Sequence, residues 1–199
     1  MKKKIFLPFA TGVLLTVISV SCNNSSENAK DTTTDSSVNT TSATTSTAPV
    51  SAPTDSMSQN PDAKLVYELT ESMYAGIALM KDGEQKATNP AVKALAAKLV
   101  TEHSKLTKDL EALSAKKGWP LPSGEPSADM QKREAMNKEE VAQFQKDWLT
   151  SLRDRHETNI GKLENAKPSD PDVKAAGEKG LPKIKELLGD IKTVQANLK

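Results

Sequence analysis

Apolar residues recur at intervals of three and four positions from Pro61 to Leu198. This spacing gathers them on one face of an α-helix, and no stretch alternates between apolar and polar residues as a half-buried strand would. The sequence therefore predicts an all-α domain. The pattern covers four long segments, at residues 61–81, 90–117, 141–166 and 171–198.

Three of these segments begin with the same signal. Asn60, Asn89 and Asp170 each precede a proline, which is typical of an N-cap residue followed by the first residue of a helix. Gly118 follows two lysines and is expected to cap the C-terminus of the second long helix. We expect the first helix to fray at Asp82-Gly83.

A loop and a short helix separate the second and third long helices. Residues 119–126 contain three prolines and a glycine and must form a loop, whose Trp119 is expected to close one end of the core. A short helix is predicted at about residues 127–136. Asn137-Lys138-Glu139-Glu140 resembles a capping box for the third long helix.

The domain from residue 61 to 199 has a normal size for one hydrophobic core. Pro182 lies inside the last segment and predicts a kink or break near Gly180-Leu181. Four long amphipathic helices with one extra short helix predict an antiparallel four-helix bundle.

The first residues resemble a secretory signal. Met1–Lys4 carries three lysines, and an apolar run follows from Ile5 to Val20. This run is shorter than the roughly 20 residues that a membrane-spanning helix needs. We therefore predict a signal peptide at residues 1–21.

Cys22, the single cysteine of the chain, follows this segment directly. Ser19-Val20-Ser21-Cys22 satisfies the small-residue rule for ordinary cleavage and also resembles a lipobox, although Ser19 stands where Leu, Val or Ile is usual. Both interpretations place the cleavage between Ser21 and Cys22. The sequence favours lipidation of Cys22 over a soluble secreted protein, and Asn23 favours the outer membrane by resemblance to lipoprotein sorting rules.

Residues 22–60 have the composition of a disordered tether. Eighteen of the 38 residues from Asn23 to Asn60 are Ser or Thr, and none is aromatic, so the segment cannot bury enough surface to offset its ordering entropy. Without the three lysines of the signal, the chain has 24 basic and 26 acidic residues, which gives a net charge near −2. This balance gives no basic stripe for nucleic acid.

The chain has two histidines, His103 and His156, and both lie on the apolar faces of long helices. Inward histidines on different helices are how bundles build metal sites, so iron, zinc or copper is one interpretation, with Glu102 as a further ligand. The alternative is that each histidine is a core residue bonded to one polar partner. The paired Glu-x-x-His motifs of a di-metal bundle are absent, since Val100 and Arg153 hold the relevant positions.

Three methionines extend the metal interpretation to a soft copper site, although at helical spacing they are expected as core residues: Met73, Met80 and Met136. The domain contains no cysteine nucleophile and no glycine-rich phosphate loop. Ser104 follows His103 directly, and adjacent positions diverge on a helix, so the two do not pair for catalysis. The sequence therefore favours a non-enzymatic role, and it leaves the cofactor unknown, with none as one possibility.

Several segments together carry a resemblance to a family of exported bacterial proteins. They are Asn89–Ala96, Val100–Lys105, Leu121-Pro122, Phe144–Trp148, His156 and Leu181-Pro182. The family is a domain of unknown function with a ferritin-like helical bundle, often labelled an outer membrane protein. The resemblance spans about residues 61–198 and implies a ferritin-like bundle with one extra short helix.

The same resemblance implies a set of polar residues in the bundle. Relatives typically carry a Glu in the first helix, an Asp-His pair in the second, a His in the long helix and another His after the Leu-Pro. The second and third elements fall on Glu102-His103 and His156, whereas the first falls near Gly76 and the last on Leu187. Half of the polar set is therefore replaced in this chain.

These observations predict a lipid-anchored envelope protein with a non-enzymatic structural or binding role. The alternative is a periplasmic metal-binding protein that uses the core histidines. We expect the membrane as a partner through the lipid, no nucleic acid, and an envelope protein as a further partner that the sequence does not identify. The expected location is the outer membrane, facing the periplasm, with the cell surface or secretion as alternatives.

Overall fold

The fold was described from a computed structural model of the chain, over residues 59–198. The predictions for the signal peptide, for Cys22 and for the tether up to residue 58 lie outside these residues. The described part of the chain contains five helices and no strand, so the all-α prediction is confirmed. The helices are α2 (Pro61–Lys86), α3 (Pro90–Lys117), α4 (Ser127–Met136), α5 (Val141–Asn165) and α6 (Pro171–Asn197).

Three of the long helices begin at the predicted caps. The side-chain oxygen of Asn60 accepts hydrogen bonds from the amides of Asp62 and Ala63, at 3.0 and 3.1 Å, and Asn89 and Asp170 act in the same way. Each cap satisfies two amides that have no partner within the helix. Gly118 ends α3 in the left-handed conformation, with φ of 64°, as predicted.

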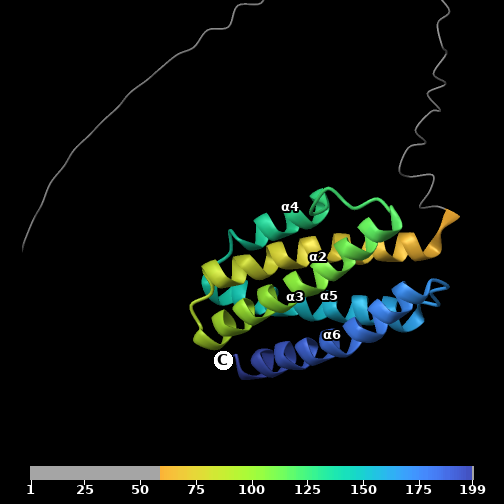
Figure 1. Ribbon diagram of the computed structural model, residues 1–199. Helices are drawn as coiled ribbons and strands as arrows, with labels where there is room; N and C mark the ends of the chain where they lie inside the picture. The colour runs from red at the N-terminus through yellow and green to blue at the C-terminus, as the bar shows by residue number, and fades with distance from the viewer. Residues whose placement is uncertain (1–58, 199) are drawn as a thin grey trace, which may run out of the picture. The chain divides into compact units, whose positions relative to one another are not determined.

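The four long helices form a bundle in which every neighbour is antiparallel (Figure 1). α2 lies beside α3 and α5, and α6 also lies beside α3 and α5, so α3 and α5 occupy opposite corners. The loop after α3 and the short α4 carry the chain back along the bundle before α5 begins. One long crossover between the second and third long helices is the ferritin-like connection, so the predicted architecture is confirmed.

The predicted fraying of the first helix at Asp82-Gly83 is wrong, because α2 continues to Lys86. Gly83 is buried against the indole ring of Trp148 in α5, so closely that a Cβ atom there would overlap the ring. The Trp148 Nε1–H donates a 2.7 Å hydrogen bond to the carbonyl of Leu79, one turn earlier. Glycine is therefore needed for helix packing at this position, and it does not end the helix.

The predicted capping box at Asn137–Glu140 is also wrong. Asn137 ends α4, and Glu140 is the N-cap of α5 without a side-chain hydrogen bond to the helix. The ammonium group of Lys86 instead binds the carbonyls of Asn137 and Glu139, at 2.5 and 2.6 Å. This contact from α2 fixes the turn that the sequence assigns to local capping.

The predicted break near Gly180-Leu181 does not occur, because α6 is continuous through Pro182. Proline removes the amide that would bind the carbonyl of Glu178, four residues earlier. Both residues are exposed, so water can satisfy this carbonyl.

The packed core occupies the half of the bundle that contains the α2–α3 turn. Phe144, Trp148 and Leu152 of α5 are fully buried there. A second, smaller cluster of Val66, Leu113 and Val173 lies toward the other end, and the half-buried Trp119 packs against it as expected. Among the described residues, no helix is long and apolar enough to span a membrane.

Candidate functional site

His103 and His156 meet in the middle of the bundle, an arrangement that their positions on apolar helix faces allowed. They come from the diagonally opposed helices α3 and α5, and both are buried, with 3% and 1% of their surface exposed. Their ring centroids are 4.9 Å apart and the ring planes cross at 71°. Each ring lies one turn beyond a core leucine, Leu99 or Leu152, so the pair marks the end of the packed core.

The backbone fixes which ring nitrogen carries the proton. The Nδ1 atoms of His103 and His156 lie 3.1 and 2.7 Å from the carbonyls of Leu99 and Leu152. A carbonyl only accepts, so each Nδ1 donates and each neutral ring keeps a free lone pair on Nε2. The Nε2 of His156 is buried and has no hydrogen-bond partner among the described residues.

The surroundings keep both imidazoles neutral. Burial, then the proximity of His156 and of the Arg155 guanidinium, lowers the pKa of His103 to about 3. Burial and Arg155 also lower the pKa of His156. Arg155 itself donates to Asp129 at 2.7 Å and to the Ser72 hydroxyl at 3.3 Å.

The resemblance implies two family polar residues near Gly76 and at Leu187. Gly76 lies beside Arg155, and a Cβ atom there would make an ordinary contact, at 3.4 Å, with the Cδ of Arg155. Leu187 is fully buried in the apolar core.

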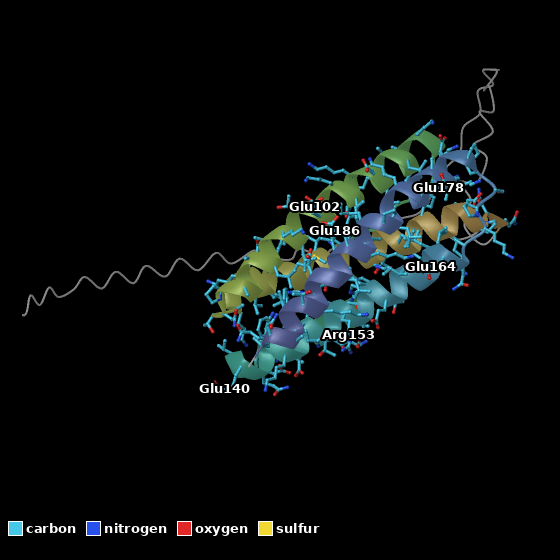
Figure 2. The ribbon with its side chains drawn as sticks, turned by 90° about the horizontal axis from the view of Figure 1, so that it is seen from below. Glu102, Glu140, Arg153, Glu164, Glu178 and Glu186 are labelled. Carbon is cyan, nitrogen blue, oxygen red and sulfur yellow. The ribbon has the colours of Figure 1, made fainter. Side chains whose placement is uncertain are left out.

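Glu102 does not face the histidines. Figure 2 shows it on the outer surface near Glu186 of α6, and its carboxylate forms a 2.7 Å ion pair with Lys105. Neighbouring helix positions differ by about 100° in direction, which turns Glu102 outward when His103 points inward.

The donors near the two imidazoles fall short of an iron or zinc site. No group of three or more His, Cys, Asp or Glu side chains within residues 59–198 is placed to hold a metal ion. Zinc sites use four ligands, or three and a water. Met73 and Met80 are buried, whereas Met136 packs only at the edge of the core. Two imidazoles beside a guanidinium therefore do not fit iron or zinc.

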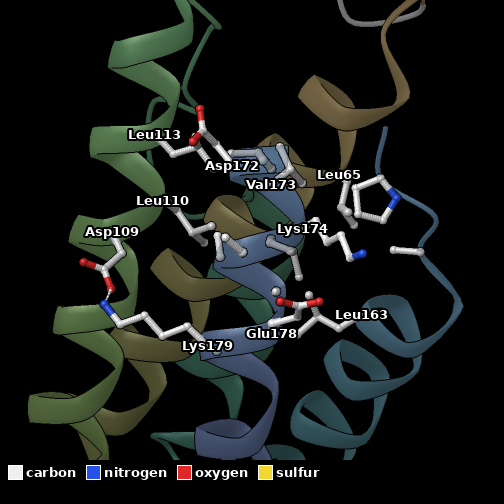
Figure 3. Close-up of a pocket in the computed structure, with 18 of the residues that line it drawn as sticks. Leu65, Asp109, Leu110, Leu113, Leu163, Asp172, Val173, Lys174, Glu178 and Lys179 are labelled. Atoms are coloured by element: carbon white, nitrogen blue, oxygen red, sulfur yellow. Dashed lines mark hydrogen bonds and ion pairs between the residues drawn. The ribbon is translucent and has the colours of Figure 1, made fainter. Parts of the chain in front are cut away.

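Beyond the histidines the bundle opens into an apolar cavity that the sequence analysis missed. Its volume is about 720 Å³, and it lies between α2, α3, α6 and the end of α5 (Figure 3). The walls are mostly aliphatic, and they include Leu69, Met73, Leu106, Leu110, Leu113, Leu163, Val173, Leu181 and Ile184. Leu106 lies one turn beyond His103, so the cavity begins where the core and the histidine pair end.

Small residues on α6 create this space. Ala176, Gly177 and Gly180 line the cavity in the first half of α6, whereas Leu187 and Ile191 fill the core in the second half. The start of α6 is held from two sides. These two contacts come from α2 and α3.

Asp62, buried in the first turn of α2, accepts hydrogen bonds from the Ser169 hydroxyl and the Asp170 amide, at 2.7 and 2.8 Å. From α3, Lys117 pairs with Asp170 and Asp172 at 2.6 and 2.7 Å. The start of α6 is thus fixed against α2 and α3, where Val173 packs with Val66 and Leu113. The change from small to large residues along one stripe is the signal that a sequence reading can use to find such a cavity.

The comparisons with known proteins agree with this fold. Residues 46–194 match the model of a family described as "Domain of unknown function (DUF4142)". The chain belongs to the DUF4142 family. The resemblance to a domain of unknown function is thereby confirmed at the level of the family, and the match covers the whole bundle up to the last turn of α6.

A solved structure has the same helical fold as the DUF4142 bundle. The chain is similar to the crystal structure of a DUF305 fragment from Deinococcus radiodurans, with a TM-score of 0.62 and 12% identity. The similarity covers 69% of this chain and 96% of the fragment. At this identity it shows the fold alone. A comparison with curated proteins found no match.

Proposed function

We propose that the chain is an exported lipoprotein of the bacterial envelope whose bundle has a non-enzymatic binding role. The cavity of about 720 Å³ is the observation that carries this proposal. Pockets that bind small molecules have volumes of roughly 300–1,000 Å³ and largely apolar walls. The contacts of Asp62 and Lys117 fix the start of α6, which lines this cavity, against α2 and α3.

Binding is tested by titrating the chain from residue 22, carrying Cys22→Ser, with the apolar fluorophore N-phenylnaphthylamine. We expect saturable fluorescence enhancement with one molecule bound per chain. Gly180→Leu should abolish it by filling the cavity, and Gly189→Leu is the matched control, because Gly189 lies on the same helix and faces open space. Absence of binding, or equal binding by Gly180→Leu, would contradict the proposal.

The anchor is proposed from the sequence. The signal features of residues 1–21, the single Cys22 and the following Asn23 support lipidation and a place in the outer membrane, facing the periplasm. Metabolic labelling with a fatty acid tests it. We expect label on the parent chain and none on Cys22→Ser. An unlabelled parent, or equal label on both, would contradict lipidation and would favour a secreted protein instead.

Metal binding is a second candidate function. The close ring contact of His103 and His156, and the unpartnered Nε2 of His156, favour it. Of iron, zinc and copper, only cuprous copper accepts two nitrogen ligands, and its single charge is least opposed by Arg155. These properties make copper the metal to test first.

Elemental analysis after refolding with each metal tests this candidate. Stoichiometric copper in the parent that is lost in His103→Ala/His156→Ala would support it. Metal that is absent, or that survives the double substitution, would exclude the histidine pair as a metal site.

A further inference from the structure

The charged residues at the cavity mouth indicate the kind of ligand that enters. Four lysines and three carboxylates line it. Two pairs neutralise each other: Lys179 with Asp109 at 2.7 Å, and Lys116 with Asp172 at 2.8 Å. These pairs bridge α6 and α3 on one side of the opening.

The remaining charges lie on the other side. Figure 3 shows Lys174 directed away from the Lys179–Asp109 pair, toward the end of α5. Lys174 and Lys167 form no ion pair with any residue in the described range, and Glu178 is the one carboxylate of the mouth that is also without one there. Two lysines against one glutamate leave this side of the mouth positive.

The interior excludes ligands with several polar groups. A polar group buried against aliphatic walls has no hydrogen-bond partner, which costs free energy. A flexible hydrocarbon chain with a single polar end avoids this cost, because the chain fills the cavity and the end remains at the mouth.

We propose that the cavity binds one long-chain fatty acid, with its hydrocarbon chain against Leu106, Leu110 and Leu163 and its carboxylate at Lys167 and Lys174. This inference rests on the proposed binding role and adds the ligand class. The Asp62–Ser169 contact places the start of α2 at the same end of the bundle as the cavity. The cavity therefore lies at the end of the domain where the segment from Cys22 joins it.

Two glycines allow the cavity to be filled from within. Cβ atoms on Gly177 and Gly180 would make ordinary contacts, at 3.9 Å to Leu163 and 4.0 Å to Leu106. Both lie in a regular helix, where leucine is favoured over glycine. Gly180→Leu and Gly177→Leu are therefore expected to fold, as circular dichroism will verify, and to occupy the space of the ligand.

The test is displacement of N-phenylnaphthylamine from the chain from residue 22 carrying Cys22→Ser, with three competitors of equal chain length. Palmitate carries a carboxylate, hexadecyltrimethylammonium a cation, and palmitoyl lysophosphatidylcholine the zwitterionic head of a membrane lipid. We expect palmitate to compete best and with a 1:1 stoichiometry. Gly180→Leu and Gly177→Leu should each weaken palmitate binding at least about tenfold, and Gly189→Leu should not change it.

The lysines test the position of the carboxylate. Lys167→Gln/Lys174→Gln should weaken palmitate about fivefold and leave hexadecyltrimethylammonium unchanged. The fatty-acid proposal is overturned if the cationic or zwitterionic competitor binds as well as palmitate, or if the glycine variants bind it like the parent. If the fluorophore binds but palmitate does not displace it, the binding role stands and the ligand class is wrong. If the fluorophore itself does not bind, both fail.

Discussion

His103 and His156 show how a helical backbone determines the chemistry of single side chains. Each Nδ1–H is committed to a carbonyl one turn earlier, and burial beside Arg155 lowers both pKa values. The result is a pair of neutral rings in the centre of the bundle. Protonation of either ring would bury a charge next to a guanidinium.

This pair predicts a loss of stability in mild acid. The folded-state pKa of His103 is about 3, against an ordinary value of 6.5, so its contribution is complete above pH 6.5 and is lost as the pH falls toward 3. The free energy of unfolding should fall by about 1.4 kcal/mol per pH unit for each histidine that remains neutral. Urea denaturation at pH 7 and pH 5, where most carboxylates stay ionised, measures it.

The double variant His103→Leu/His156→Leu is the control for this slope. It removes the two titrating rings, and the carbonyls of Leu99 and Leu152 can keep their bonds within the helices. The difference in stability between pH 7 and pH 5 should shrink to a small fraction of the parent value. An unchanged difference would show that other groups cause the acid sensitivity.

The packing of Gly83 leads to a second prediction for a single residue. Gly83→Ala places a methyl group against the Trp148 ring and forces α2 and α5 apart, which should lower the free energy of unfolding by about 1–3 kcal/mol. Gly189→Ala, in an exposed part of α6, should be neutral or stabilising by up to about 1 kcal/mol. Thermal denaturation compares the two, and equal effects would contradict the packing role of Gly83.

Among the helices, α4 is attached in a different way from the others. None of its residues is buried, and charge pairs attach it to the bundle. Arg133 pairs with Asp82 of α2 at 2.7 Å and with Glu125 of the loop at 3.1 Å, and Asp129 pairs with Arg155 of α5 at 2.7 Å. The pKa of Arg133 is raised by the carboxylates of Glu125 and Asp82. Charge pairs of this kind weaken in salt more than apolar packing does.

We therefore expect Arg133→Ala to release α4 while the four long helices stay folded. Hydrogen exchange of the amides in residues 127–136 should accelerate at least about tenfold. Lys132→Ala, at an exposed position beside it, is the matched control and should leave exchange unchanged. Unchanged exchange in Arg133→Ala would show that α4 is held by other contacts.

Sequence patterns predict the features of these helices that are local. The caps at Asn60, Asn89 and Asp170 involve residues two and three positions away, and all three are confirmed. The turn before α5 was predicted wrongly, because Lys86 fixes it from 51 residues away in the chain. The cavity was missed for the same reason, since the helices that line it are brought together by contacts between residues far apart in the chain, such as Asp62 and Ser169, 107 residues apart.

The sequence likewise predicted one part of the candidate site and missed another. Helical periodicity placed His103 and His156 inside, but it left open whether the two rings meet in the core, as they do. Periodicity did not show Arg155 beside them, because a residue next to His156 is expected to point away. Its side chain lies beside Gly76 of α2 and reaches Ser72 and Asp129.

For the whole molecule, the bundle is divided along its length. One half has the larger packed core, the histidine pair marks its end, and the other half contains an apolar cavity beside the smaller cluster of Val66, Leu113 and Val173. This arrangement allows stability and binding to reside in different halves of one domain. Substitutions in the packed half should change stability, and substitutions in the cavity half should change binding.

The central claim is that an apolar ligand enters the cavity between α2, α3 and α6. Methyl NMR of the chain from residue 22 carrying Cys22→Ser, labelled at leucine, tests this most directly as N-phenylnaphthylamine is added. The claim predicts shifts at the methyl groups of Leu106, Leu110 and Leu163, and none at Leu149 and Leu152 in the packed half. Shifts that are absent, or that are equal in both halves, would contradict it.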